Sequence, residues 1–295
     1  MRTILPFHPS NRAPVPASAA ERCVSCSEEL TTPFCAQCGE QRASDRRYSL
    51  LQFGKDILEG LANFDSAFLR TVRTLIARPG ELTAAYMRGE RTRYTKPLQL
   101  FVLVSVAFFL SAVVTNVHTF DTPLRIHTAQ WTKPQHMVAQ RVAERHTTMP
   151  QYAAVFDQAS TAQAKSLVII MVPVFALLVA LIEVRKRRYA LQHLVFALHS
   201  YTALLIVLMA TNLLTVYPLS LLLVYAGRFL HTKGESAVSL GAVIAMFVYL
   251  LRALRRAYLD GRLAAPVKAL ALVVGMVVLL FAYRLVLFYT TFWTT

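Results

Sequence analysis

Long apolar runs constrain this 295-residue chain more than any other feature of its sequence. An α-helix needs about 20 apolar residues to cross about 30 Å of hydrocarbon, and several runs reach or approach that length. Membrane β-strands would instead alternate between apolar and polar residues. With 55% hydrophobic residues, 16% charged residues and a mean hydropathy of +0.44, the chain is too apolar for an ordinary soluble domain. We therefore expect an all-α polytopic membrane protein.

Basic flanks give the predicted spans their direction, because Lys and Arg collect in cytoplasmic loops. The first span follows a cluster of four basic residues, and the second ends at the basic residues 185–188. With the arginine-rich loop 252–262 also in the cytoplasm, about five crossings result, with the amino end inside and the carboxyl end outside. The predicted spans are 98–117, 167–184, 194–214, 237–254 and 267–293.

Two segments between the spans do not fit a simple crossing. Residues 216–230 are apolar, but a crossing there would place the loop 252–262 outside, so we expect an external interfacial or re-entrant helix. The alternative is a six-crossing topology with that loop exposed outside. The polar segment 118–166 is placed outside the cell, where it is expected to form short helices that lean on the spans.

The region before the first span differs from the spans in composition and in the spacing of its apolar residues. Residues 1–20 are rich in Pro, Ala and Ser, lack the apolar core of a signal peptide and are expected to form a flexible tail. Residues 44–97 show apolar positions at steps of three and four, which predicts cytoplasmic amphipathic helices, the last over residues 81–88. These helices are expected on the inner membrane surface or against the spans; the alternative is a bundle packed on itself.

All four cysteines of the chain lie close together, within residues 21–43. Two C-x-x-C pairs eight residues apart can wrap one ion, since each pair folds tightly enough for both sulfurs to reach it. This spacing predicts a small zinc ribbon, and four protein sulfurs leave no position for water or substrate, so the metal would be structural. The predicted ligands of one Zn²⁺ ion are Cys23, Cys26, Cys35 and Cys38.

Disulfides, a redox dithiol and iron are the alternatives to zinc at these cysteines. A disulfide framework needs an oxidising compartment, whereas the basic flanks place this region in the cytoplasm. A redox dithiol does not come as a matched pair of pairs. Iron in the same tetrahedron remains open, because four thiolates accept either metal.

The chain resembles DUF3667, a family of bacterial membrane proteins of unknown function. The resemblance rests on CxxC…FCxxCGEQ, which ends at Gln41, and on LRTVRTLIARPGELTAAYMRGERTRYTKPLQLF, residues 69–101. It covers about the first third of the chain, and beyond Phe101 only the hydropathy is similar. The resemblance implies a zinc ribbon and a bacterial membrane protein, and it implies no catalytic activity. Together with the basic flanks, it leads us to expect the bacterial cytoplasmic (inner) membrane, with the amino terminus in the cytoplasm.

A basic cluster borders the first span. The guanidinium groups of arginines match the geometry of phosphate oxygens, so the cluster could hold anionic lipid headgroups. The alternative is that these residues orient the first span and anchor it at the membrane interface. The residues of this cluster are Arg88, Arg91, Arg93 and Lys96. The formal charge of +15 could also suggest nucleic acid, but cytoplasmic loops explain it better, and residues 23–41 carry three glutamates and no Lys or Arg.

Few ionisable side chains lie within the predicted spans. Arg284 can reach the outer interface, and the spacing of His193 and His199 puts them on different helix faces. No catalytic motif occurs, so an enzyme is not expected. The leading hypothesis is a membrane adaptor whose ribbon recruits an unidentified cytoplasmic protein; a solute or lipid transporter and a membrane-tethered nucleic-acid binder are the alternatives. The sequence leaves homo-oligomerisation open.

Overall fold

The computed structural model describes residues 22–40, 42, 66–115, 120, 122–186, 188–216, 218 and 233–295. Two compact units result, Met1–Arg46 and Arg47–Thr295. The predicted tail, the amphipathic stretch before residue 66 and most of the predicted helix 216–230 lie outside the described residues. Within the described part, the regular elements are helices, and the small unit adds an isolated antiparallel bridge between Arg22 and Glu29. The all-α class is therefore confirmed.

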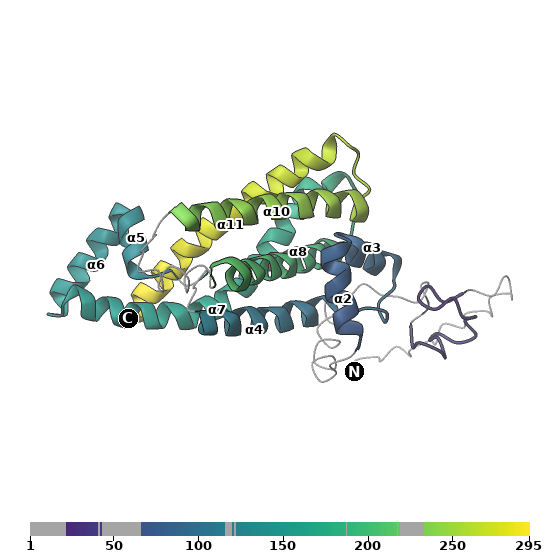
Figure 1. The fold of residues 1–295 in the computed structure, drawn as a ribbon, viewed down its shortest axis with the longest axis horizontal. Coiled ribbons are helices and arrows are strands. Elements are labelled where there is room, and N and C mark those ends of the chain that lie inside the picture. Colours follow the sequence, from purple (N-terminus) through teal and green to yellow (C-terminus); the bar gives the residue numbers. More distant parts are fainter. Residues whose placement is uncertain are drawn as a thin grey trace, which may run out of the picture. The chain divides into compact units, whose positions relative to one another are not determined.

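The larger unit is a helix bundle with short helices at both ends. In Figure 1, α2 and α3 lie at one end of this unit and α5 and α6 at the other. A 3₁₀ turn, η2 (Val184–Lys186), follows α7, and a π-helical turn, η3 (Asn212–Val216), follows α8. The helices are α2 (Ser66–Ala77), α3 (Glu81–Arg88), α4 (Pro97–Thr115), α5 (Leu124–Gln130), α6 (Thr132–Glu144), α7 (Met149–Ile182), α8 (Ala190–Thr211), α10 (Lys233–Ala257) and α11 (Ala264–Thr294).

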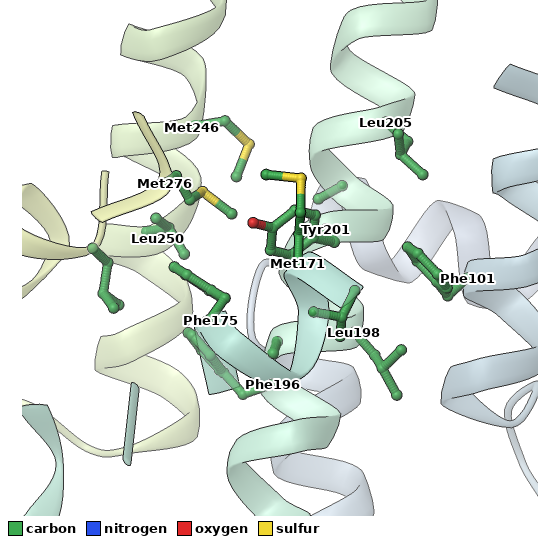
Figure 2. Close-up of a cluster of buried hydrophobic side chains, with 14 of the residues drawn as sticks. Phe101, Met171, Phe175, Phe196, Leu198, Tyr201, Leu205, Met246, Leu250 and Met276 are labelled. Carbon is green, nitrogen blue, oxygen red and sulfur yellow. The ribbon is translucent and has the colours of Figure 1, made fainter. Parts of the chain in front are cut away.

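Helix α8 lies in the interior of the bundle, where α4, α7 and α10 pack against it. All side chains from Val195 to Ala203 are buried, so α8 is covered on every face over more than two turns. A helix that is apolar all round is expected in such a position. Figure 2 shows this core, in which Phe101 of α4, Phe175 of α7 and Leu250 of α10 surround side chains of α8.

The outer helices expose apolar side chains on their outward faces. Three helical segments are long and apolar enough to cross a membrane, Met149–Ile182, Ala190–Leu214 and Ala264–Thr294, whereas Pro97–Val113 is a shorter apolar helix. An apolar belt of this extent indicates a lipid-facing surface. The exposed side chains include Leu110 and Val113 on α4, Leu177 and Leu181 on α7, Leu240 and Ile244 on α10, and Leu270 and Val278 on α11.

Helix α7 is longer than the sequence analysis predicts. It begins at Met149, whereas the predicted span begins at residue 167, so the predicted external segment contains α5, α6 and the first half of α7. A capping box between Thr148 and Gln151 starts the helix. The extension is polar but amphipathic: Tyr152 and Phe156 are buried one turn apart. Hydropathy alone marks where a helix becomes apolar and not where it begins.

Contacts between helix ends define the direction of each helix. At one end of the bundle, the Nζ atom of Lys268 donates to the Glu183 carboxylate at 2.8 Å. Lys268 lies near the start of α11, and Glu183 directly follows the end of α7. At the other end, Gln163 of α7 donates to the Thr294 hydroxyl at the end of α11, at 2.8 Å. Helices α7 and α11 are therefore antiparallel. The carboxyl end of α10 lies beside α3, because Arg256 of α10 donates to the Pro79 carbonyl just before α3 at 3.1 Å.

Candidate metal centre and the helix-end network

The two cysteine pairs form knuckles with the same backbone hydrogen bonds. In the first, residues 23–28, the N–H of Ser27 donates to the Cys23 carbonyl at 2.8 Å and the N–H of Cys23 donates to the Glu28 carbonyl at 2.7 Å. The second knuckle, residues 35–40, repeats both bonds at 2.8 Å. The sequences CVSCSE and CAQCGE thus fold as two copies of one turn.

The residue after the second cysteine of each knuckle takes a left-handed conformation. Gly39 has φ 72°, and Ser27 has φ 65° at the equivalent position. Glycine adopts this region readily, whereas a serine does so at a cost. The left-handed serine could have been predicted only by noticing that the two knuckles are repeats.

The four sulfurs gather at one point. The Sγ atoms of Cys23 and Cys38 are 3.5 Å apart, as are those of Cys26 and Cys35, and all four lie within 4.8 Å of one another. A tetrahedral ion with metal–sulfur bonds of about 2.3 Å would space its ligands by about 3.8 Å. The cluster therefore has the dimensions of a four-thiolate metal site, and its four cysteines are free of disulfides.

Polar contacts hold the knuckles together and favour the thiolate at Cys35. The Ser25 hydroxyl in the first knuckle donates to the Glu40 carboxylate in the second at 2.8 Å. The backbone N–H of Cys38, followed by that of Gln37, lowers the pKa of the Cys35 thiol to about 7 against the opposing effect of burial. The pKa of the Cys38 thiol is raised, chiefly by burial, and that of the Cys26 thiol is raised as well. Because the thiolate is the form that binds metal, Cys35 is the ligand that these N–H groups prepare for an ion.

The predicted basic cluster is partly neutralised by its own neighbours. Arg88 forms ion pairs with Glu81 at 2.8 Å and with Glu90 at 2.7 Å. Arg93 lies 3.9 Å from Glu90, and Lys96 precedes α4 directly. The guanidinium of Arg88 is therefore engaged within the protein, and a headgroup site formed by the whole cluster stays a prediction.

Two arginines of the same cluster lie over aromatic rings. The guanidinium of Arg91 is 4.8 Å from the centre of the Tyr86 ring, and that of Arg93 is 5.6 Å from the centre of the Tyr94 ring. Such pairs orient the arginine side chains by a cation–π attraction of about 0.5–1 kcal/mol at exposed sites.

A tight turn docks α3 against α10. Gly80 has φ 83°, and a Cβ atom added there would lie 2.6 Å from the Ala253 carbonyl oxygen. The turn is clamped by Arg256 of α10, which donates to the Pro79 carbonyl at 3.1 Å and lies 3.6 Å from the Glu81 carboxylate. Only glycine allows the two backbones to approach so closely.

A buried ion-pair network joins the ends of α7, α10 and α11. The Nζ atom of Lys268 lies 2.8 Å from Glu183 and 2.9 Å from Asp260, whose carboxylates are both almost fully buried. Lys186 adds a contact to Asp260 at 3.3 Å and donates to the Tyr258 carbonyl at 2.8 Å. Sequence reasoning missed this network, because charges that border apolar runs were interpreted only as orientation signals.

The two histidines at the start of α8 have separate partners. The Nδ1 atom of His193 lies 2.8 Å from the Tyr258 hydroxyl, and the two rings stack at 5.7 Å. The Nδ1 atom of His199 lies 2.9 Å from the Thr83 hydroxyl of α3. Both histidines are buried and link α8 to other elements, which extends the network around this end of the bundle.

These features define an all-helical protein with three helices long and apolar enough for a membrane and a four-cysteine cluster near its amino terminus. Residues 65–109 match the family model of DUF3667, described as a protein of unknown function, and this confirms the resemblance. The matched stretch includes α2, α3, the Gly80 turn and the first part of α4. No curated protein and no solved structure matches the chain significantly.

Proposed function

We propose that this protein is a non-catalytic adaptor of the bacterial inner membrane, and that its cytoplasmic zinc ribbon recruits a protein partner to the membrane. The observation that carries the proposal is the closed cluster of four thiols, all within 4.8 Å of one another, in a unit with almost no apolar core. A metal bound by four protein sulfurs stabilises the fold of the ribbon and has no coordination position left for a substrate.

Zinc is the proposed ion. Four thiolates in a tetrahedron suit zinc best, although iron accepts the same ligands. Binding free energies of about 10–16 kcal/mol are typical of such sites, which suffices to fold a unit of this size. The buried part of the ribbon contains few side chains, with Leu30 packed beside Cys23 and Cys35.

The proposed topology has five crossings, with the amino end in the cytoplasm. Supporting it, the end of α7, the end of α10 and the start of α11 lie together beside α3, where arginines are concentrated. The positive-inside rule assigns an end of this kind to the cytoplasm. Helix α8 then crosses once.

The surface of the ribbon favours a protein over nucleic acid as its partner. Phe34 is 57% exposed and Val24 is 43% exposed, and two glutamates, Glu28 and Glu29, are also exposed. Between Cys23 and Gln41 there is no Lys or Arg. Exposed apolar residues with acidic neighbours suit a protein with a basic rim, whereas a phosphate backbone requires positive charge.

The proposal is tested by site-specific photo-crosslinking in intact cells, with the photoreactive residue at Phe34. We expect a crosslinked cytoplasmic partner from the native ribbon and none from the variant Cys35→Ser, Cys38→Ser, although both insert into the membrane. Gln37→Ala is the matched control, because it changes the same knuckle without removing a sulfur, and it should keep the crosslink.

Identical crosslinks from the native ribbon and from the Cys35→Ser, Cys38→Ser variant would remove the basis of the proposal. Solute flux in reconstituted vesicles, absent from empty vesicles, would favour a transporter instead. Salt-sensitive retention of nucleic acid by the protein would favour the nucleic-acid binder.

A further inference from the structure

Three methionines converge in the core of the bundle, each from a different helix. Met171 belongs to α7, Met246 to α10 and Met276 to α11, and all three are at least nine-tenths buried. Figure 2 shows the ends of their side chains pointing toward one another, beside the hydroxyl of Tyr201 on α8. The four side chains belong to one core cluster.

The Tyr201 hydroxyl has no hydrogen-bond partner among the described residues, and its side chain is 0% exposed. Leaving a buried hydroxyl unpaired costs free energy, so a position of this kind calls for an explanation. The ring is held in place by Phe175, which meets it edge to face at 5.5 Å. The hydroxyl is therefore fixed beside the methionines.

The four residues lie near the middle of their helices. Tyr201 is at the centre of α8 (Ala190–Thr211), and Met246 is at the centre of α10 (Lys233–Ala257). If the bundle crosses a membrane, this cluster lies far from both surfaces. Sites for transported or bound ions in membrane proteins are found at such depths, between facing helices.

Thioether sulfur selects a particular class of ligand. It is neutral and polarisable, so it binds soft ions such as Cu(I) and does not replace the hydration shell of hard ions such as Na⁺ or Mg²⁺. A neutral site of this kind also avoids a buried charge when the ion is absent. Packing alone does not require sulfur at three facing positions, because leucine fills a similar volume.

We propose that Met171, Met246 and Met276, with the Tyr201 hydroxyl beside them, bind one soft monovalent cation of the Cu(I) class in the centre of the bundle. This site is separate from the four-cysteine cluster and goes beyond the proposed adaptor function. It would let the protein sense or hold a soft ion within the membrane without any charged side chain in the core.

The experiment uses Ag(I), which shares the sulfur preference of Cu(I) and has no accessible redox change. The full chain is purified in detergent with its four ribbon cysteines replaced by Ser, so that thiolates cannot bind the probe, and Ag(I) binding is measured by titration calorimetry. We expect one saturable Ag(I) site per chain, with no competition from excess Na⁺. Each of Met171→Leu, Met246→Leu and Met276→Leu should weaken it about tenfold or more, a scale typical of changes at metal sites.

Met209→Leu is the matched control. Met209 also packs against the core from α8, but outside the converging group, so its replacement should leave the affinity unchanged. The proposal is overturned if the cysteine-free chain shows no saturable Ag(I) binding. It is also overturned if all three leucine variants bind as the parent chain does. Because leucine conserves the volume of methionine, the single variants are expected to fold, which thermal unfolding in detergent checks.

Discussion

At the scale of single residues, Gly80 shows how closely two backbones approach in this protein. Its φ of 83° and the 2.6 Å separation between an added Cβ atom and the Ala253 carbonyl oxygen leave no room for a side chain. The obstacle is backbone of α10, which cannot rotate away as the end of a side chain can. The family-matched stretch therefore meets the bundle at a point where only glycine fits.

We predict that Gly80→Ala lowers the free energy of unfolding by about 2 kcal/mol or more, because it combines a left-handed alanine with overpacking. Gly241→Ala is the control, since an added Cβ atom there meets nothing within 4 Å. That change lies within α10 and should stabilise the protein by about 0.5–1 kcal/mol. Thermal unfolding of both variants in detergent is the measurement, and equal melting temperatures would contradict the prediction.

At the scale of elements, the network around Lys268 holds three helix ends in place. The Lys268 ammonium group contacts two carboxylates: Glu183 follows the end of α7 and Asp260 follows the end of α10. A buried ion pair of this kind adds little net stability to the fold. Removing one partner is nevertheless strongly destabilising, because it leaves an uncompensated buried charge. The network thus fixes the arrangement of α7, α10 and α11.

We predict that Lys268→Met destabilises the bundle by about 3 kcal/mol, because both carboxylates lose their closest cation. The double variant Glu183→Gln, Lys268→Met should recover part of this loss, since it also removes one buried charge. Lys133→Met, at an exposed position of α6, should have little effect. Thermal unfolding in detergent decides, and the prediction fails if the double variant is less stable than Lys268→Met alone.

At the scale of the whole molecule, the chain consists of two compact units with different sources of stability. The larger unit is held by packing around α8, whereas residues 22–42 have almost no apolar core and four gathered thiols. A metal can therefore be essential to one unit and irrelevant to the other.

We predict that a strong zinc chelator unfolds the ribbon and leaves the bundle folded. Hydrogen exchange should rise across residues 22–42 to the rate of an unfolded chain, while α7 and α8 keep their protection. Elemental analysis of the untreated protein should give one zinc per chain. Loss of protection in both units together would show that the bundle depends on the metal.

Local patterns made part of the structure predictable. The cysteine spacing predicted the cluster of four thiols because the cysteines of a knuckle lie within a few residues of one another. The helix predicted over residues 81–88 has the limits of α3, and the glycines that border it, Gly80 and Gly89, both have positive φ. The start of α7 was missed because its first half is polar and amphipathic, and hydropathy does not register such a helix.

The sequence by itself determined the helical class, the presence of apolar helices long enough for a membrane and the grouping of the four cysteines, because each depends on residues close together in the chain. Only the tertiary structure decided which side chains meet across the bundle. Lys268 and Glu183 are 85 residues apart, and the three converging methionines come from three helices. Such encounters depend on how helices rotate and pack, and a single sequence carries no local signal for that.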